Sequence, residues 1–180
     1  MKTKNIIYIS IAIGLSAILG FILFKPEEDL MEKLSNLTIK EQVIYLDKTT
    51  DEENGMFANI TPTTFMYGKG EDVIELDLSN EDFYLSIAPY INQTHPCFNH
   101  NLITCRGELK NKTFKVTVVD KNNQVIIDDE YKSGDNGFAG IWLPRNIEGT
   151  LTVTYNGLAA SQFIRTGLED GTCLTDLQLK

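Results

Sequence analysis

The sequence predicts an α+β protein in which a small helical N-terminal section is followed by an antiparallel, sandwich-like β domain, with one transmembrane helix in front. Three observations support this prediction. The N-terminus carries a long uncharged apolar run, apolar residues at helical spacing follow it, and alternating segments begin at residue 72. We therefore divide the 180 residues into an anchor over 1–25, a helical section over 26–71 and a β-rich domain over 72–180.

The first 25 residues have the pattern of a membrane anchor. Residues 6–24 form an apolar run without a charge, and lysines flank it on both sides. As a helix this run would be about 28 Å long at ~1.5 Å per residue, close to the ~30 Å hydrocarbon core of a bilayer. The early lysines favour a cytoplasmic N-terminus, so residues 26–180 would lie on the extracytoplasmic face. Secretion after signal cleavage is the alternative, although no clean small-x-small cleavage site ends the run.

Two short helices are expected after the anchor. The first is predicted from apolar residues at helical spacing, namely Leu30, Met31, Leu34 and Leu37. Thr38 and Glu41 have the spacing of a capping box, in which each side chain satisfies a backbone N–H at the start of a helix. This pair predicts a second helix over 39–47.

The remaining chain shows the pattern of many short strands. Alternating or β-branched segments predict strands at 73–78, 83–88, 114–118, 125–127, 138–143, 151–155, 162–165 and 175–179. Turn-forming residues separate these segments, and Asn156-Gly157 is the strongest of the turn signals. Short strands that alternate with turns are typical of an antiparallel sandwich.

The charge of the chain excludes some classes of partner. The net charge is −9, and all 25 acidic residues lie beyond residue 25. Such a surface repels phosphate backbones and anionic lipid headgroups. We therefore expect no nucleic-acid partner, and contact with a membrane only through the N-terminal helix.

Scarce residues gather in one segment of the β-rich part. Two of the three cysteines and both histidines lie between His95 and Cys105, and Cys97 and His100 are close enough in sequence to reach one ion. The third cysteine, Cys173, precedes the last predicted strand. Thiolates with an imidazole suit Cu(I) or Zn²⁺ rather than hard ions. Cu(I) accepts two or three such ligands, whereas the second close ligand pair of a typical zinc site is missing here, so Zn²⁺ is expected only as a competitor.

A structural disulfide accounts for the same cysteines. Exported cysteines tend to pair, so Cys97 with Cys105, or Cys105 with Cys173, would form a bond and leave one thiol over. The chain would then be a membrane-anchored, immunoglobulin-like surface domain without a metal. A thiol–disulfide oxidoreductase is a weaker option, because the chain has no Cys-x-x-Cys motif and no βαβ pattern. On the residues alone, the disulfide and the metal site both remain open.

Three separated motifs add a further signal. The first, over 88–109, contains Cys97-x-x-His100-x-x-x-x-Cys105 and ends in Gly-Glu-Leu. The second, over 135–145, is Asp-Asn-Gly-Phe-x-Gly-Ile-Trp-Leu-Pro-Arg, and the third, over 172–179, is Thr-Cys-Leu-Thr-x-Leu-Gln-Leu. Together they resemble the CueP family of copper-binding proteins, strongly over 83–180 and more loosely over 28–82.

The resemblance implies an extracytoplasmic copper-binding protein that sequesters copper and contributes to copper tolerance. It further implies delivery to a copper-accepting protein such as a superoxide dismutase, a homodimer, and reduction of Cu(II) to Cu(I) by the cysteines in place of a classical enzyme activity. The metal ligands it implies are Cys97, His100, Cys105 and Cys173, with Cys97 as third ligand or resolving thiol. Family members are exported soluble proteins, so the predicted anchor is a departure that leaves the superoxide dismutase partner open.

Overall fold

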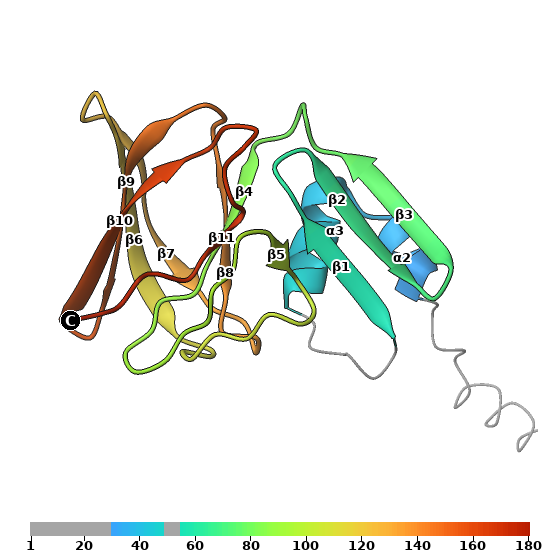
Figure 1. Ribbon diagram of the computed structural model, residues 1–180, viewed down its shortest axis with the longest axis horizontal. Coiled ribbons are helices and arrows are strands. Elements are labelled where there is room, and N and C mark those ends of the chain that lie inside the picture. Colours follow the sequence, from blue (N-terminus) through green and yellow to red (C-terminus); the bar gives the residue numbers. More distant parts are fainter. Residues whose placement is uncertain (1–29, 49–54) are drawn as a thin grey trace, which may run out of the picture. The chain divides into compact units, whose positions relative to one another are not determined.

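The computed structural model describes residues 30–48 and 55–180 (Figure 1). The chain divides into two compact units, 1–36 and 37–180, which are treated separately. In the first unit the described part contains α2 (Leu30–Ser35), as the apolar spacing predicts. The predicted transmembrane segment lies outside the described residues, and no helix within the described ranges has the length and apolar character needed to cross a membrane.

The second unit begins with α3 (Ile39–Asp47), and the capping box predicted for it is present. The Glu41 carboxylate accepts from the backbone N–H of Thr38 at 2.8 Å, and the Thr38 hydroxyl accepts from the backbone N–H of Glu41 at 3.4 Å. These reciprocal bonds satisfy donors that the first turn of a helix leaves free. The helix buries Val43 and Leu46 and ends at Asp47, whose side chain is also buried.

The first sheet was only partly predicted. It has the antiparallel order β3-β2-β1-β5, with β1 (Met56–Ile60), β2 (Thr64–Lys69), β3 (Asp72–Asp77) and β5 (His100–Asn101). The predicted helical section over 26–71 is wrong for residues 56–60 and 64–69, which form β1 and β2. Each of the two strands places three apolar residues side by side, at 56–58 and 65–67, so the alternation that indicates a strand is weak. The boundaries predicted at residues 25 and 71 stay predictions.

Two further sheets contain the other strands. Their orders are β10-β9-β6-β7 and β11-β4-β8, with β4 (Phe83–Ile87), β6 (Thr113–Asp120), β7 (Val125–Lys132), β8 (Ala139–Leu143), β9 (Glu148–Tyr155), β10 (Leu158–Arg165) and β11 (Cys173–Leu174). The sheets form two layers (Figure 1) and share one hydrophobic core, to which Phe83 and Ile141 contribute from one sheet and Val116 and Leu151 from the other. The α+β class is thereby confirmed.

The end of the chain differs from the all-antiparallel expectation. Strand β11 lies parallel to β4, with Cys173 opposite Ser86, so this sheet is mixed. The predicted strand over 175–179 is present only as an isolated bridge between Tyr90 and Gln178. Its alternating leucines reflect burial in the core rather than a regular ladder. The parallel pairing brings Cys173 to the loop that follows β4.

Two loops of this unit touch backbone to backbone at Gly107 and Gly137. The N–H of Gly107 donates to the carbonyl of Asn136 at 2.6 Å. A Cβ atom on Gly137 would collide with the Gly107 backbone, and the φ of Gly137 is +82°, a conformation that favours glycine. The contact holds the segment just after Cys105 against the segment just before Phe138, and both of these residues belong to the site described next.

Candidate metal centre

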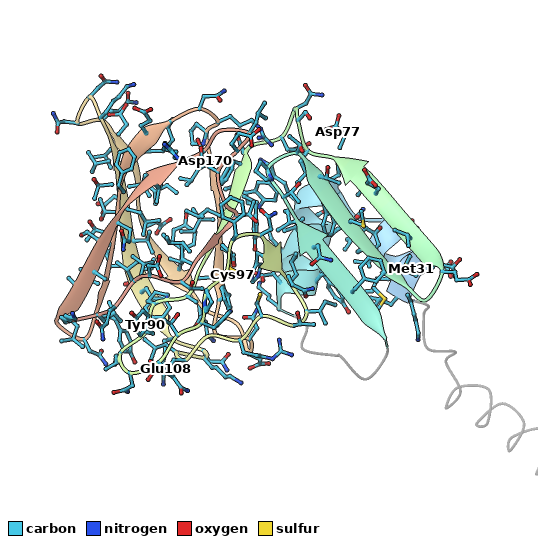
Figure 2. The ribbon with its side chains drawn as sticks, in the orientation of Figure 1. Met31, Asp77, Tyr90, Cys97, Glu108 and Asp170 are labelled. Carbon is cyan, nitrogen blue, oxygen red and sulfur yellow. A yellow bond between two sulfur atoms is a disulfide. The ribbon has the colours of Figure 1, made fainter. Side chains whose placement is uncertain are left out.

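Four side chains from different parts of the second unit meet at one point. One ligand atom from each of Cys97, His100, Cys105 and Cys173 lies within 4.8 Å of the others. Cys97 belongs to the loop between β4 and β5 (Figure 2), His100 is the first residue of β5, Cys105 follows that strand, and Cys173 begins β11. The four residues that the sequence analysis selected are therefore brought together, and His95 is not part of the group.

The three sulfur atoms are not equivalent. Cys97 and Cys173 form a disulfide that links positions 76 residues apart, and Cys105 is a free, half-buried thiol. The Cys105 Sγ lies 3.8 Å from the Cys97 Sγ. Both pairings considered from the sequence, Cys97 with Cys105 and Cys105 with Cys173, are wrong. The observed pairing follows from the position of β11, where the N–H of Cys173 donates to the Phe98 carbonyl at 3.0 Å.

The disulfide limits what the site can bind. Metal ions bind thiolates, and the sulfurs of a disulfide carry no such charge. While the disulfide is intact, the Cys105 sulfur and the His100 imidazole are the members of the group that can still bind a metal ion. With the bond reduced, three thiolates and one imidazole become available in the same small volume.

His100 is fully buried and is held by contacts on several sides. Its Nε2 lies 2.7 Å from Oδ1 of Asp47, and its Nδ1 lies 3.8 Å from the Sγ of Cys173. The Phe138 ring covers the imidazole with 4.5 Å between ring centroids. His95 meets the edge of the same phenyl ring at 6.1 Å. The two histidines of the motif therefore have different positions, one inside the cluster and one beside it.

Charge interactions favour an imidazolium next to a thiolate. Burial on its own would lower the pKa of His100, but hydrogen bonds to Asp47 and Cys105 outweigh it and raise the pKa to about 9. Burial would likewise raise the pKa of Cys105, but the hydrogen bond and the charge of His100 outweigh it and lower that pKa. A soft cation entering the site would meet a Cys105 thiol that loses its proton more readily than usual, and it would displace protons as it binds.

Asp47 is the site residue that sequence reasoning missed. It was predicted only as the last residue of a helix, 53 positions before His100, and no motif connects the two. Its one sequence signal is that a helix of mainly apolar inward residues ends in an acidic one. Asp47 is only 6% exposed, which is unusual for aspartate and indicates that its side chain has partners.

Glu108, which follows the cysteines of the first motif in sequence, accepts hydrogen bonds from residues 91–93 at the start of the loop that carries Cys97. Its Oε2 accepts from the backbone N–H groups of Ile91 at 2.7 Å, Asn92 at 2.9 Å and Gln93 at 3.3 Å. Its Oε1 accepts from the Asn92 side chain at 2.8 Å. Figure 2 shows Glu108 near Tyr90, at the start of this loop. The carboxylate therefore fixes the first turn of the loop that carries Cys97.

The Glu108 contacts predict a defined pH dependence. The Asn92 backbone N–H, with the other donors, lowers the pKa of Glu108 from 4.5 to about 2. A depressed folded-state pKa stabilises the fold above the unfolded value, and this contribution is lost as the pH falls from about 4.5 through about 2. Glu108→Gln should therefore lower the urea midpoint most at pH 7, and the difference from the unmodified protein should shrink toward pH 2. A constant difference across this range would contradict the assignment.

Comparison with known proteins identifies the family. The sequence model described as "Periplasmic copper-binding protein CueP" matches residues 41–178. The chain belongs to the CueP family. A crystal structure described as "Crystal Structure of S.CueP" is 45% identical, with a TM-score of 0.78, and the match covers 83% of this chain and 93% of that chain. No curated protein matches the chain.

The CueP match over residues 41–178 confirms the resemblance proposed from the three motifs, including most of its looser part over 28–82. It begins within α3 and includes the first sheet and all four clustered residues. The family is described as periplasmic, so the comparison supports an extracytoplasmic location.

Proposed function

We propose that this protein binds copper outside the cytoplasm through Cys97, His100, Cys105 and Cys173, and that it sequesters the metal to protect the cell. The observation that supports this most directly is the approach of three sulfurs and one imidazole nitrogen to within 4.8 Å of one another, in a chain of a family described as copper-binding. Copper is the cargo of such a site rather than a permanent cofactor.

Cu(I) is the ion that these donors favour. Thiolates are soft ligands that select Cu(I), and two or three of them are sufficient for it. Zn²⁺ would need a tetrahedral set of four, which the cluster offers only when all three thiols are reduced. We therefore expect Cu(I) to be bound more tightly than Zn²⁺, and by more than one redox form of the protein.

Cys97 and Cys173 are proposed to supply electrons as well as ligands. Two thiolates give one electron each to two Cu(II) ions, the S–S bond forms, and two Cu(I) ions result. The disulfide in the structure corresponds to the oxidised product of this step. A thiol reductant would then have to return two electrons and two protons before the full ligand set is available again.

We further propose that the protein delivers its copper to another protein and is attached to the membrane. The bound Cu(I) would pass to a copper-accepting protein, of which a superoxide dismutase is one candidate, and the chain would act as a homodimer. The apolar run over 6–24 would keep the copper-binding unit on the extracytoplasmic face of the membrane. Cleavage of that run would instead release a secreted protein.

A second candidate is an immunoglobulin-like surface domain with a structural disulfide and no metal. The Cys97–Cys173 bond favours it, since a disulfide between distant segments is typical of exported domains. The two candidates differ in what the free thiols do when copper is added.

Thiol counting under anaerobic conditions tests the proposal. After reduction, the folded protein should show three reactive thiols, and one equivalent of Cu(I) should protect at least two of them from a thiol reagent. The same titration with Zn²⁺ compares the two ions, and metal analysis of protein from copper-supplemented cells checks the native cargo. Three thiols that stay equally reactive in the presence of Cu(I) would instead support the surface domain.

A further inference from the structure

We infer that Asp47, the last residue of α3, is a positioning residue for the copper site and fixes which nitrogen of His100 binds the metal. This inference rests on the proposed function and adds to it a residue outside the Cys/His motif. The imidazole lies between the carboxylate on one side and the sulfur cluster on the other. Nε2 is 2.7 Å from Asp47 Oδ1, and Nδ1 is 3.8 Å from Cys173 Sγ.

The partners of Asp47 show that its carboxylate acts as an acceptor. The Tyr84 hydroxyl is 2.7 Å from Oδ2, and the side-chain amide of Asn136 donates to Oδ1 at 3.2 Å and to the main-chain carbonyl of Asp47 at 2.6 Å. With amide and hydroxyl donors on these oxygens, the bond to His100 is also one that Asp47 accepts. Nε2 therefore carries the hydrogen, and Nδ1 is the nitrogen that faces the sulfurs.

Asn136 links the carboxylate to the ring that covers the imidazole. While its amide nitrogen donates to Asp47, its Oδ1 accepts from the backbone N–H of Phe138 at 2.9 Å. The Phe138 ring lies on His100 with 4.5 Å between centroids. One buried asparagine thus positions both the carboxylate at the edge of the imidazole and the phenyl ring on its face.

A second set of bonds couples His100 to Cys173. The backbone N–H of His100 donates to the Thr172 hydroxyl at 3.0 Å, and that hydroxyl donates to the Ile60 carbonyl of β1 at 2.7 Å. Thr172 directly precedes Cys173 in the chain, so the hydrogen bonds of its hydroxyl hold His100 and Cys173 in fixed relative positions. These contacts fix the His100 backbone, and the bond to Asp47 then fixes the orientation of the His100 imidazole.

The position of Asp47 ties the helix to the chemistry of the site. The C-terminus of a helix carries a partial negative charge, which adds to that of the carboxylate beside Nε2. A carboxylate that accepts from a metal-bound imidazole fixes its orientation and raises its basicity. Loss of such a partner typically costs about 10–100-fold in metal affinity. Displacement of α3 would therefore weaken copper binding although no ligand changes.

Asp47→Asn tests the inference because it keeps the size of the side chain and removes its charge. In reduced protein, a chelator competition should show Cu(I) affinity about 10–100-fold weaker than in the unmodified protein. Nitrogen-15 NMR of the Cu(I) form should show His100 bound through Nδ1 with the hydrogen on Nε2. Tyr84→Phe is the matched control, since it removes the donor on Oδ2 and leaves the bond between Oδ1 and His100, and its affinity should change much less.

The outcomes separate this inference from the proposed function. A folded Asp47→Asn protein with unchanged Cu(I) affinity, or a Cu(I) complex bound through Nε2 in the unmodified protein, would overturn the role of Asp47. If the unmodified protein binds no Cu(I), the proposed function fails instead. In that case the metal-free protein still tests the contact, because the Nε2–H proton of His100 should resonate far downfield and should move upfield in Asp47→Asn. If Asp47→Asn does not fold, the nitrogen-15 NMR of the unmodified Cu(I) protein tests the inference, because it shows which nitrogen of His100 binds the metal.

Discussion

Replacing Cys105 or Cys173 with serine is expected to lower the Cu(I) affinity of the reduced protein by about 100-fold or more while the fold survives. Serine keeps nearly the same size but offers a hard hydroxyl that does not ionise in place of a soft thiolate. Removing a residue that hydrogen-bonds to a metal ligand typically lowers the metal affinity about 10–100-fold. Removing the ligand itself should therefore lower the affinity by at least the upper end of that range. Cys105 is half-buried, and its substitution leaves the core intact.

Competition against a Cu(I) chelator in reduced, air-free protein measures this effect. His95→Gln is the matched control, because His95 belongs to the same loop and lies outside the group of four. We expect its affinity to stay within about threefold, as for a substitution that changes the free energy by roughly 0.5 kcal/mol. Unchanged competition by both serine variants would contradict the copper site, and a loss in His95→Gln as large as in Cys105→Ser would show that the loop rather than the sulfur matters.

The parts of the fold that depend on neighbouring residues were predictable. The capping box of α3 involves residues three positions apart, and the turn at Asn156-Gly157 needs only its own two residues, both with positive φ. Strands β1 and β2 were missed because apolar residues stand side by side in them, at 56–58 and 65–67, in place of a clear alternation. The parallel pairing of β11 with β4 was missed for a different reason. It joins Cys173 to Ser86, and no local pattern contains that information.

The same distinction applies to the site. Cys97, His100 and Cys105 could be selected because they are scarce residues within one short segment. Cys173 entered through a family resemblance, and its disulfide with Cys97 depends on the pairing of β11 that the sequence did not reveal. Asp47 carries only a weak local signal, since an acidic residue at the end of a helix is ordinary until its burial is known.

Reduction of the Cys97–Cys173 disulfide is expected to lower the free energy of unfolding of the copper-free protein by about 2–4 kcal/mol. The bond closes a loop of 76 residues, for which the chain-entropy description gives about 4.5 kcal/mol, and measured values are often lower. The bond also joins the loop after β4 to β11, so reduction frees two segments that meet at the site. Urea unfolding with and without a thiol reductant, in the absence of air, measures the difference. In Cys97→Ser the reductant should have no effect on the midpoint.

Cu(I) should restore most of this loss, because a metal held by residues from distant segments links them as the disulfide does. A ligand that binds only the folded state at a free concentration 100 times its Kd stabilises that state by about 2.7 kcal/mol. The reduced, copper-free protein should therefore be the least stable form, and Cys105→Ser should regain less stability from copper than the unmodified protein does. If reduction leaves the midpoint unchanged, the bond does not constrain the unfolded chain. If Cu(I) fails to raise the midpoint of the reduced protein, the ion does not link these segments. If both results are as expected, either the disulfide or bound Cu(I) is sufficient to link the loop after β4 to β11 and stabilise the fold.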